Sequence, residues 1–345
     1  MKFSKSILNW YHDHKRELPW RTTKDPYRIW LSEIILQQTR VEQGRPYYER
    51  FLRAFPTVWA LAQASEDEVL KLWQGLGYYS RARNMHSAAK TIVEQHDGIF
   101  PSTYEDLLKL KGVGDYTASA IASICFGEQK AVVDGNVFRV LARYFGVDIP
   151  INSTEGVKYF RNLAQRVADK EEIADYNQGI MEFGAMQCAP KKPYCLLCPL
   201  KDGCLALAQG KIQQLPVKVK KGTIKLRYFN FVVFLDPAER TLLQRREGKG
   251  IWQGLYQFPL IEGKSPFQRA EIVQQIKEDF PAYEPVSVDR FNDDPILHKL
   301  SHQHLSTTFW IVHLKSPLSD GVPWSTIKKY PVPVLIADMM ERFKN

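Results

Sequence analysis

The sequence predicts a multidomain protein in which an all-α domain is followed by a domain of mixed α+β class. In residues 1–208, apolar residues recur at helical spacing and short turn signals separate the runs. In residues 226–345 the pattern changes to strands with two helical stretches. Between them, residues 209–225 are rich in lysine with little apolar periodicity, which is typical of a basic linker. A chain of 345 residues can build two separate cores.

The elements of each domain follow from these patterns. The first domain carries the helical repeat at 28–41, 65–75, 82–95, 105–111, 115–126, 136–145 and 155–168. Turn signals between these helices are GLGYY, HDGIFPS, KGVGD and VDGN. The second domain has strand patterns at 228–236, 240–247, 254–260 and 306–315, and helical stretches at 266–280 and 333–343.

The composition describes a basic protein. The net charge of +9 and the pI of about 9.1 favour an acidic partner, of which nucleic acid is the commonest, although solubilising lysines give the same balance. The N-terminal apolar run is broken by Asn9, His12 and Asp13 and is no signal peptide. No segment approaches the roughly 18 to 20 apolar residues that span a bilayer. We therefore expect a protein that binds no membrane and is cytoplasmic (nucleoid-associated if bacterial), or nuclear or organellar if the host is eukaryotic. We also expect it to be a monomer.

Four cysteines crowd into one short segment. Cys188, Cys195, Cys198 and Cys204 are separated by six, two and five residues. A disulfide framework is out of place in a large reduced protein, so the spacing indicates a metal site. Zinc sites more usually show two C-x-x-C knuckles, and one is present here, whereas cysteine-only ligation in a compact loop suits a [4Fe–4S] cluster. The spacing favours the cluster and leaves zinc open; Cys125 is expected to be a buried, inert thiol.

The turn Gly112-Val113-Gly114 joins a helix that ends at LLKLK to one that begins at Asp115. This arrangement is a helix–hairpin–helix, in which two glycines allow a tight turn and close approach of another backbone. The exposed N–H groups at the start of the second helix suit a phosphate. Most such turns only join helices, but in a basic protein the motif favours non-specific binding of the DNA backbone.

Two carboxylates are candidates for acid–base chemistry. Glu33 has mostly apolar neighbours at helical spacing, so burial should raise its pKa and let it hold a proton near neutral pH. The alternative is a boundary glutamate that pairs with an arginine. Asp134 stands at the N-cap of the predicted helix at 136–145. Capping alone is a sufficient reason for an aspartate there, but the helix N-terminus also keeps its carboxylate ionised. One protonated and one charged carboxyl is the pairing that breaks glycosidic bonds.

Together these motifs resemble the helix–hairpin–helix DNA glycosylases with an iron–sulfur cluster, and within them the adenine DNA glycosylases of the MutY type. The resemblance covers nearly the whole chain. The stretches that carry it are LPWR (18–21), WLSEIILQQTRV (30–41), GLGYYSRARN (75–84), LKGVGDYTA (110–118), VDGNVFRVLAR (133–143) and CAPKKPYCLLCPLKDGC (188–204). It implies hydrolysis of the N-glycosidic bond of adenine opposite 8-oxoguanine, or more weakly guanine, in double-stranded DNA, and a [4Fe–4S] cluster on the four cysteines.

The resemblance also implies roles for single residues. Glu33 resembles the general acid that protonates the purine, and Asp134 the anion that stabilises the sugar cation, with Asn136 in support. The expected pocket for the flipped adenine is formed by Trp20, Arg21, Leu36 and Gln178. The residues expected to intercalate around the partner base or to recognise 8-oxoguanine are Gln38, Thr39, Leu76, Tyr78, Ser301 and His302.

Tyr116 distinguishes this chain from relatives that also cut the DNA strand. Those enzymes resemble it in motif but have a lysine at this place, which attacks the sugar and forms a Schiff base. A tyrosine cannot form an imine, so the resemblance implies a monofunctional enzyme that leaves an abasic site. It also implies that Tyr116 is close enough to hydrogen-bond Asp134.

The second domain resembles the Nudix-like lesion-recognition domain of the same family, through GIWQGLYQFPLIE (250–262). A hydrolytic Nudix helix contains R-E-x-x-E-E, and AEIVQQIKEDF (270–280) lacks it, so we expect no nucleotide hydrolysis. KLSHQHL (299–305) resembles the family's Phe-Ser-His loop, with Leu300 in place of phenylalanine and with Ser301 and His302 matching. The nearby histidines lack a carboxylate or cysteine set, and we expect no metal there.

Two rival functions are considered. An endonuclease III-like glycosylase with lyase activity conflicts with Tyr116, with Glu33 and with the second domain. A non-catalytic DNA-binding protein with a redox-sensing cluster would be expected to have lost Glu33 or Asp134, and both are present.

Overall fold

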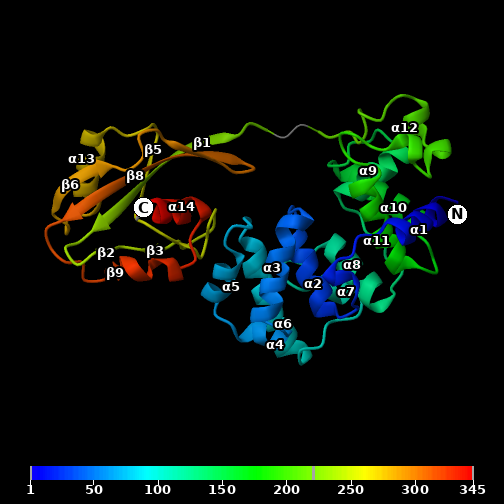
Figure 1. Ribbon diagram of the computed structural model, residues 1–345, viewed down its shortest axis with the longest axis horizontal. Coiled ribbons are helices and arrows are strands. Elements are labelled where there is room, and N and C mark those ends of the chain that lie inside the picture. The colour runs from blue at the N-terminus through cyan, green and yellow to red at the C-terminus, as the bar shows by residue number, and fades with distance from the viewer. Residues whose placement is uncertain (1, 220–221, 344–345) are drawn as a thin grey trace. The chain divides into compact units, whose positions relative to one another are not determined.

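A computed structural model describes residues 2–219 and 222–343 (Figure 1). Lys220 and Lys221 of the predicted linker lie outside the described residues, as do positions 1, 344 and 345. The chain divides into two compact units. We call residues 2–63 and 84–219 the helical unit, and residues 64–83 and 222–343 the sheet unit.

The helical unit consists of helices joined by short turns, as predicted. The helices predicted at 115–126, 136–145 and 155–168 are confirmed to within one residue at each end. The elements, of which α6 begins within the sheet unit, are α1 (Lys2–His14), η1 (Pro19–Arg21), α2 (Pro26–Leu36), α3 (Val41–Ala54), α4 (Val58–Gln63), α6 (Ser80–His96), α7 (Tyr104–Leu107), α8 (Asp115–Phe126), α9 (Gly135–Tyr144), α10 (Thr154–Val167), α11 (Ile173–Met186), η2 (Cys195–Leu197), η3 (Lys201–Gly203) and α12 (Leu205–Ala208).

The helices predicted at 28–41 and 105–111 are wrong in their C-terminal parts. α2 ends at Leu36, because the chain turns through Gln38, whose φ of 56° lies in the left-handed region and cannot continue the helix. α7 ends at Leu107, because the next amides close short turns instead: Lys109 N–H donates to Asp106 O at 3.1 Å.

The packing of α2, α8, α9 and α11 brings the candidate catalytic residues together. Asp25 caps α2, accepting from Tyr27 N at 2.9 Å, Gly114 is the N-cap of α8, and Asp134 is the N-cap of α9. α2 packs against α8, and α11 packs against α8 and α9. Trp30 anchors α2, since its fully buried ring meets the edge of Phe100 at 5.5 Å between centroids.

The sheet unit contains a five-stranded sheet with the order β5-β1-β8-β6, and β7 also pairs with β8. The two long central strands run parallel, with Lys225 opposite Gln303 and Leu235 opposite His313, while the other pairs are antiparallel. The elements are α5 (Glu66–Trp73), β1 (Lys225–Leu235), β2 (Arg240–Thr241), β3 (Gln244–Arg245), β4 (Tyr256–Gln257), β5 (Leu260–Gly263), α13 (Arg269–Asp279), β6 (Pro285–Arg290), β7 (Ile296–Lys299), β8 (Gln303–Leu314), β9 (Val322–Pro323), η4 (Trp324–Lys329) and α14 (Val334–Arg342).

The predicted α+β class of this region is confirmed, with differences in the short strands. α13 buries Ile272 and Ile276, one helical turn apart, in a core with Val232 and Trp310 of the central strands. The single strand predicted at 240–247 is wrong: it consists of β2 and β3, which pair with different partners, β9 and β4. The stretch predicted at 254–260 holds only β4 and the start of β5, since Pro259 between them lacks an N–H for a ladder.

Residues 64–83 belong to the sheet unit through contacts of α5. Arg245 NH2 donates to Glu66 Oε1 at 2.9 Å, Tyr256 OH donates to Asp67 Oδ2 at 3.2 Å, and Lys71 Nζ donates to Tyr330 O at 3.2 Å. A segment that lies between helices of the helical unit in the sequence is therefore part of the same compact unit as the sheet.

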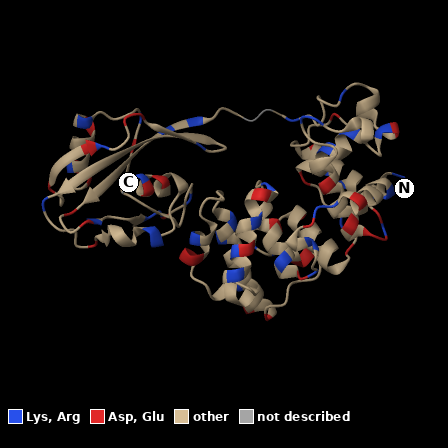
Figure 2. Cartoon of the chain, viewed as in Figure 1, with Lys and Arg blue, Asp and Glu red and all other residues tan. Residues whose placement is uncertain are grey.

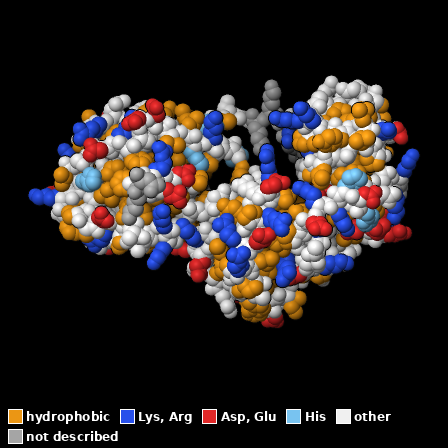
Figure 3. Space-filling view, viewed as in Figure 1, with side chains coloured by type: hydrophobic (Ala, Val, Ile, Leu, Met, Phe, Trp, Pro, Cys, Tyr) orange, Lys and Arg blue, Asp and Glu red, His pale blue; other side chains and the backbone are white. Residues whose placement is uncertain are grey.

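Lys and Arg are spread over both units and mixed with Asp and Glu (Figure 2). The face seen in Figure 3 shows the same mixture, with hydrophobic side chains between the charges. On that face the basic side chains are thus spread among acidic and hydrophobic ones rather than gathered into one block. Within the described residues, the helices are either too short or too polar to cross a bilayer.

Candidate active site

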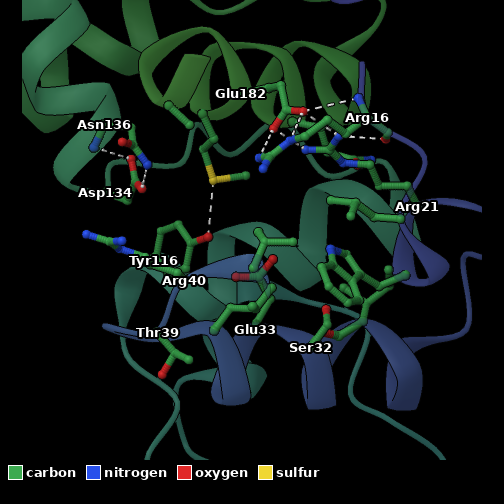
Figure 4. A pocket seen from close by; sticks show the side chains of 18 of the residues that line it. Arg16, Arg21, Ser32, Glu33, Thr39, Arg40, Tyr116, Asp134, Asn136 and Glu182 are labelled. Carbon is green, nitrogen blue, oxygen red and sulfur yellow. Dashed lines mark hydrogen bonds and ion pairs between the residues drawn. The ribbon is translucent and has the colours of Figure 1, made fainter. Parts of the chain in front are cut away.

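One pocket of about 460 Å³ in the helical unit collects most of the predicted site residues of that unit. Their side chains come from η1, α2, α8, α9 and α11, and from the segments that follow α2 and precede α9 (Figure 4). The predicted residues that line the pocket are Trp20, Arg21, Glu33, Leu36, Thr39, Tyr116, Asp134, Asn136 and Gln178.

Glu33 lies on α2 one turn after the buried Trp30, where its side chain is half-buried at the edge of the core. Burial raises the pKa of Glu33 to about 7, and the charge of Asp134 acts in the same direction. The Tyr116 hydroxyl and the Arg21 guanidinium lower the same pKa without cancelling the rise. A carboxyl with this pKa holds a proton near neutral pH and can donate it to a bound base.

Asp134 caps α9, as predicted, and its carboxylate receives three hydrogen bonds. Asn136 N and Val137 N each donate to Oδ1 at 2.8 Å, and Asn136 Nδ2 donates to Oδ2 at 2.7 Å. Contrary to the expectation from the helix terminus, the pKa of Asp134 is raised above its usual value, because burial outweighs these bonds. Since the three donors stabilise the anion, we expect Asp134 to carry the charge of the pair and Glu33 to carry the proton.

Tyr116 lies in the first turn of α8, and its side chain lies near both Asp134 and Glu33 (Figure 4). Its hydroxyl donates to Met181 Sδ at 3.1 Å. The bond to Asp134 that the resemblance implies is not among the hydrogen bonds of the described residues. Burial, and then the charges of Glu33 and Asp134, raise the pKa of the Tyr116 phenol well above its usual value, so the hydroxyl is neutral.

The sequence analysis missed Glu182, which fixes Arg21 in the pocket. Glu182 is buried on α11 and accepts two hydrogen bonds from Arg21, at 2.9 and 2.8 Å, and two more from the Arg16 side chain, both at 2.7 Å. These arginines overcome the cost of burial and hold the pKa of Glu182 at about 2. The sequence signal for Glu182 was an acidic residue in a largely apolar stretch, one helical turn after Gln178.

Arg139 was missed as well. It is buried on α9 and donates to Asn136 Oδ1 at 2.9 Å, to Gly184 O at 2.6 Å and to Cys188 O at 2.8 Å. Arg139 thereby links the side chain of Asn136, which contacts Asp134, to the backbone of Cys188 through hydrogen bonds. The only signal in the sequence was an arginine between apolar residues on a predicted helix.

The predicted hairpin has the expected backbone. Gly112 has a φ of 80°, and a Cβ there would meet Asn84 Cβ at 2.7 Å, so this position requires glycine. Val113 is buried and anchors the turn, while Gly114 is exposed with open space around a Cβ position. The first turn of α8 thus presents its N–H groups beside an open groove of about 960 Å³, which extends to Glu33 and Asp134.

Comparisons with known proteins agree with this geometry. Residues 31–165 match the sequence model of the HhH-GPD superfamily of base excision DNA repair proteins, and residues 230–342 match that of the NUDIX domain. The adenine DNA glycosylase of Buchnera aphidicola subsp. Baizongia pistaciae is 35% identical over 312 residues, which cover 90% of this chain and 86% of that protein. This chain belongs to the adenine DNA glycosylase family. It is therefore an enzyme, a hydrolase of N-glycosyl bonds, and the predicted family and fold class are confirmed.

Further comparisons agree with the family and with the fold of the helical unit. The human adenine DNA glycosylase is 43% identical over 222 residues, which cover 62% of this chain and 41% of that protein. The structure of a thermostable thymine-DNA glycosylase is 30% identical with a TM-score of 0.56, covering 60% of this chain and 95% of that one. An endonuclease III–DNA complex at 20% identity, with a TM-score of 0.53, shows the shared helical fold. The non-catalytic rival is thereby set aside.

The predicted lesion-recognition residues of the sheet unit lie around a second cavity of about 500 Å³. Tyr78 is exposed, has a φ of 47°, and its hydroxyl contacts the Ser301 hydroxyl. Leu300 lines the same cavity. Of the predicted residues, those that line it are Leu76, Tyr78, Ser301 and His302. Gln38 and Thr39 belong to the helical unit, in the turn between α2 and α3.

The four clustered cysteines are half-buried in the loop through η2 and η3. Arg143 organises the start of this loop, since its guanidinium donates to Ala189 O at 2.9 Å, to Pro190 O at 3.0 Å and to Cys188 Sγ at 3.4 Å. Within the described part of the chain, no three of the four Sγ atoms lie within 4.8 Å of one another. Cys125 is half-buried on α8, and burial raises the pKa of its thiol to about 12, which fits an inert residue.

Proposed function

We propose that this enzyme excises adenine mispaired with 8-oxoguanine, and more weakly with guanine, from double-stranded DNA and leaves an abasic site. The observation that carries the proposal is the pair formed by Glu33 and Asp134. Both line one pocket, where burial raises the pKa of Glu33 to about 7 while three hydrogen bonds stabilise the anion of Asp134.

Glu33 supplies the proton and Asp134 the negative charge. Protonation of the adenine N7 by Glu33 makes the base a leaving group, and the sugar then develops oxocarbenium character. The Asp134 carboxylate stabilises that positive charge until a water molecule adds to the sugar carbon, loses a proton and so completes the hydrolysis. Asn136 contacts both oxygens of Asp134, through its backbone N–H and its side chain, and so holds the carboxylate in place.

The rest of the pocket accommodates the flipped base, which must leave the helical stack before the bond is accessible. Trp20 is fixed edge-on against Tyr48, with 5.1 Å between ring centroids, and offers an aromatic wall. Arg21 is held by Glu182 and offers donors, while Leu36 and Gln178 complete the lining. A volume of about 460 Å³ is sufficient for a purine base.

Tyr116 supports base removal without strand cleavage. Its neutral hydroxyl stands next to the carboxyl pair, where a lyase would need an amine to attack the sugar carbon. No imine can form on a phenol, so the product is an abasic site on an intact strand. All these side chains come from one helical unit, which supports action as a monomer.

Recognition of 8-oxoguanine is assigned to the sheet-unit cavity. Tyr78 offers a ring in a constrained backbone, and Ser301 and His302 offer polar groups in the same cavity. Leu300 supplies the apolar contact for which the family more often uses phenylalanine. Gln38 and Thr39 are assigned to the space around the partner base.

The cysteine loop fits a [4Fe–4S] cluster better than a zinc ion. A tetrahedral zinc ion with Zn–S bonds of about 2.3 Å brings its four sulfurs within about 4 Å of one another. Cysteine-only ligation in one compact loop, with a single C-x-x-C knuckle, suits a cluster of several irons. Cys188, Cys195, Cys198 and Cys204 would hold it, and once bound it would fix the loop and supply a redox-active centre.

The test is a single-turnover assay on duplexes that carry adenine opposite 8-oxoguanine, guanine or thymine, and on one with an oxidised pyrimidine. Each is run with and without hot alkali, which cleaves at abasic sites. The proposal expects cleavage of the adenine strand only after alkali, fastest opposite 8-oxoguanine and absent opposite thymine. Direct nicking, or equal rates for all partner bases, would overturn it.

A further inference from the structure

The hairpin that faces the groove contains an acidic residue at the place where a phosphate would bind. Asp115 is the first residue of α8, directly after the N-cap Gly114. The N–H groups at this end attract anions, and a DNA phosphate is the anion that the enzyme must accept. A half-exposed carboxylate at the same end repels that phosphate.

The groove shows where the phosphates pass. Its lining runs from Gly112 and Gly114 at the hairpin to Glu33 and Asp134 at the catalytic pair, over a volume of about 960 Å³. A nucleotide whose base enters the pocket beside Glu33 must have its flanking phosphates in this groove. Asp115 lines it too, and therefore lies on the path of the strand from which the base is removed.

Arg161 is positioned to cancel this charge. Located on α10, it also lines the groove and donates from NH2 to Asp115 Oδ2 at 2.7 Å. The other oxygen, Oδ1, accepts from the Tyr104 hydroxyl at 2.8 Å. Both carboxylate oxygens of Asp115 thus accept a hydrogen bond. One of the two donors, Arg161 on α10, carries a full positive charge.

We propose that Arg161 neutralises Asp115 at the hairpin, so that the carboxylate does not weaken the binding of the DNA backbone in the groove. The intact pair contributes no net charge to the groove. Asp115 alone would lower the affinity for DNA by repelling phosphates, and the charge of Arg161 offsets this repulsion. The inference rests on the proposed DNA substrate, but concerns backbone affinity and not base excision.

The test measures the dissociation constant of the full chain for an undamaged duplex across salt concentrations. Each effective charge contributes about 0.9 to the slope of log affinity against log salt, or roughly 3.5-fold between 50 and 200 mM salt. Asp115→Asn should tighten binding and steepen the slope by about 0.9, since Arg161 then faces the phosphates unpaired. Arg161→Ala should weaken binding and flatten the slope, and Arg161→Lys should restore it.

Two controls separate this effect from general charge and from folding. The double variant Asp115→Asn/Arg161→Ala should bind like the parent, because the net charge of the groove is unchanged. The pair Arg45–Glu49 on α3 has matched exposure and a 2.9 Å contact but does not line the groove, so Glu49→Gln should leave affinity and slope unchanged. Thermal melts of each variant confirm the fold, and a helix-terminal role alone would shift the melting temperature without changing the slope.

The outcomes are decisive for the pair. An unchanged slope in Asp115→Asn, or weaker binding of that variant, would overturn the inference. An effect of Glu49→Gln equal to that of Asp115→Asn would overturn it too. Complete absence of DNA binding by the parent chain would instead contradict the proposed function, so the two failures are distinguishable.

Discussion

Arg21 is held in the candidate adenine pocket by Glu182, which accepts hydrogen bonds of 2.9 and 2.8 Å from its guanidinium. Glu182→Gln leaves two arginines without their carboxylate and should cost about 3 kcal/mol of unfolding free energy, because breaking a buried ion pair exposes uncompensated charge. Arg16 is about a third exposed, which keeps the loss at the lower end of that range. Denaturant unfolding at pH 7 measures it.

The pH dependence of this loss has a defined sign. The pKa of Glu182 is lowered to about 2 in the folded chain, against about 4.3 when unfolded, so its stabilisation is complete above pH 5. It disappears as the pH falls through 4 toward 2. The stability difference between the parent and Glu182→Gln should therefore shrink in that window, and a difference that persists at pH 2 would contradict the ion-pair assignment.

Adenine release should depend on the protonation of Glu33. Its pKa of about 7 predicts a single-turnover rate that falls as the pH rises above 7, since only the protonated form can act as an acid. Tyr116→Phe removes a hydroxyl that lowers this pKa, so the falling limb should move to higher pH. A limb that stays in place would mean that Tyr116 does not act on Glu33.

The two hairpin glycine positions, 112 and 114, differ in whether they tolerate a side chain. Gly112→Ala should destabilise the enzyme by about 1 to 2 kcal/mol or more and weaken DNA binding, because φ is 80° and a Cβ would meet Asn84 at 2.7 Å. Gly114→Ala is the matched control, with φ of −99° and open space at the Cβ position. Thermal melts and duplex binding of both variants measure the contrast, and equal effects would contradict it.

Selectivity for the lesion should depend on Ser301. Ser301→Ala removes a hydroxyl from the sheet-unit cavity and should reduce the preference for adenine opposite 8-oxoguanine over adenine opposite guanine by about 3- to 10-fold, the value of one hydrogen bond. Rates opposite guanine should change little. Equal loss on both duplexes would indicate a role in folding instead.

The cysteine loop predicts the iron and sulfide content of the purified enzyme. The anaerobically purified enzyme should contain about four irons and four acid-labile sulfides per chain, because cysteine-only ligation at this spacing suits a [4Fe–4S] cluster. Cys198→Ser should lower the iron content and the melting temperature together. One zinc ion per chain and no iron would contradict the assignment.

Much of the helical fold follows from local patterns. The predicted helix at 115–126 coincides with α8, since Gly114 and the left-handed Gly127 define its ends in the sequence itself. α3 and α11 were not predicted, because their apolar residues are interrupted by polar ones such as Glu182 whose partners come from elsewhere in the chain. The short strands β6 and β7 were missed because their stability comes from pairing with β8.

The sequence allowed the catalytic carboxyl residues to be predicted, but not the pKa of Asp134 or the ion pairs around the pocket. Helical spacing around Glu33 and the N-cap position of Asp134 are local features, and the structure agrees with both. The raised pKa of Asp134 depends on burial by α2, α8 and α11, which no local pattern contains. Glu182 and Arg139 act through residues distant in the chain, so their contacts appear only once the helices have packed.

The most direct test of the central claim compares single-turnover adenine release by the parent enzyme and by Glu33→Gln, opposite 8-oxoguanine at pH 7. The amide side chain of this variant keeps the shape of the carboxyl but cannot donate the proton, so release should fall by at least about 100-fold while duplex affinity is retained. Release within about 3-fold of the parent, with an intact strand before alkali, would contradict the role of Glu33 as the acid.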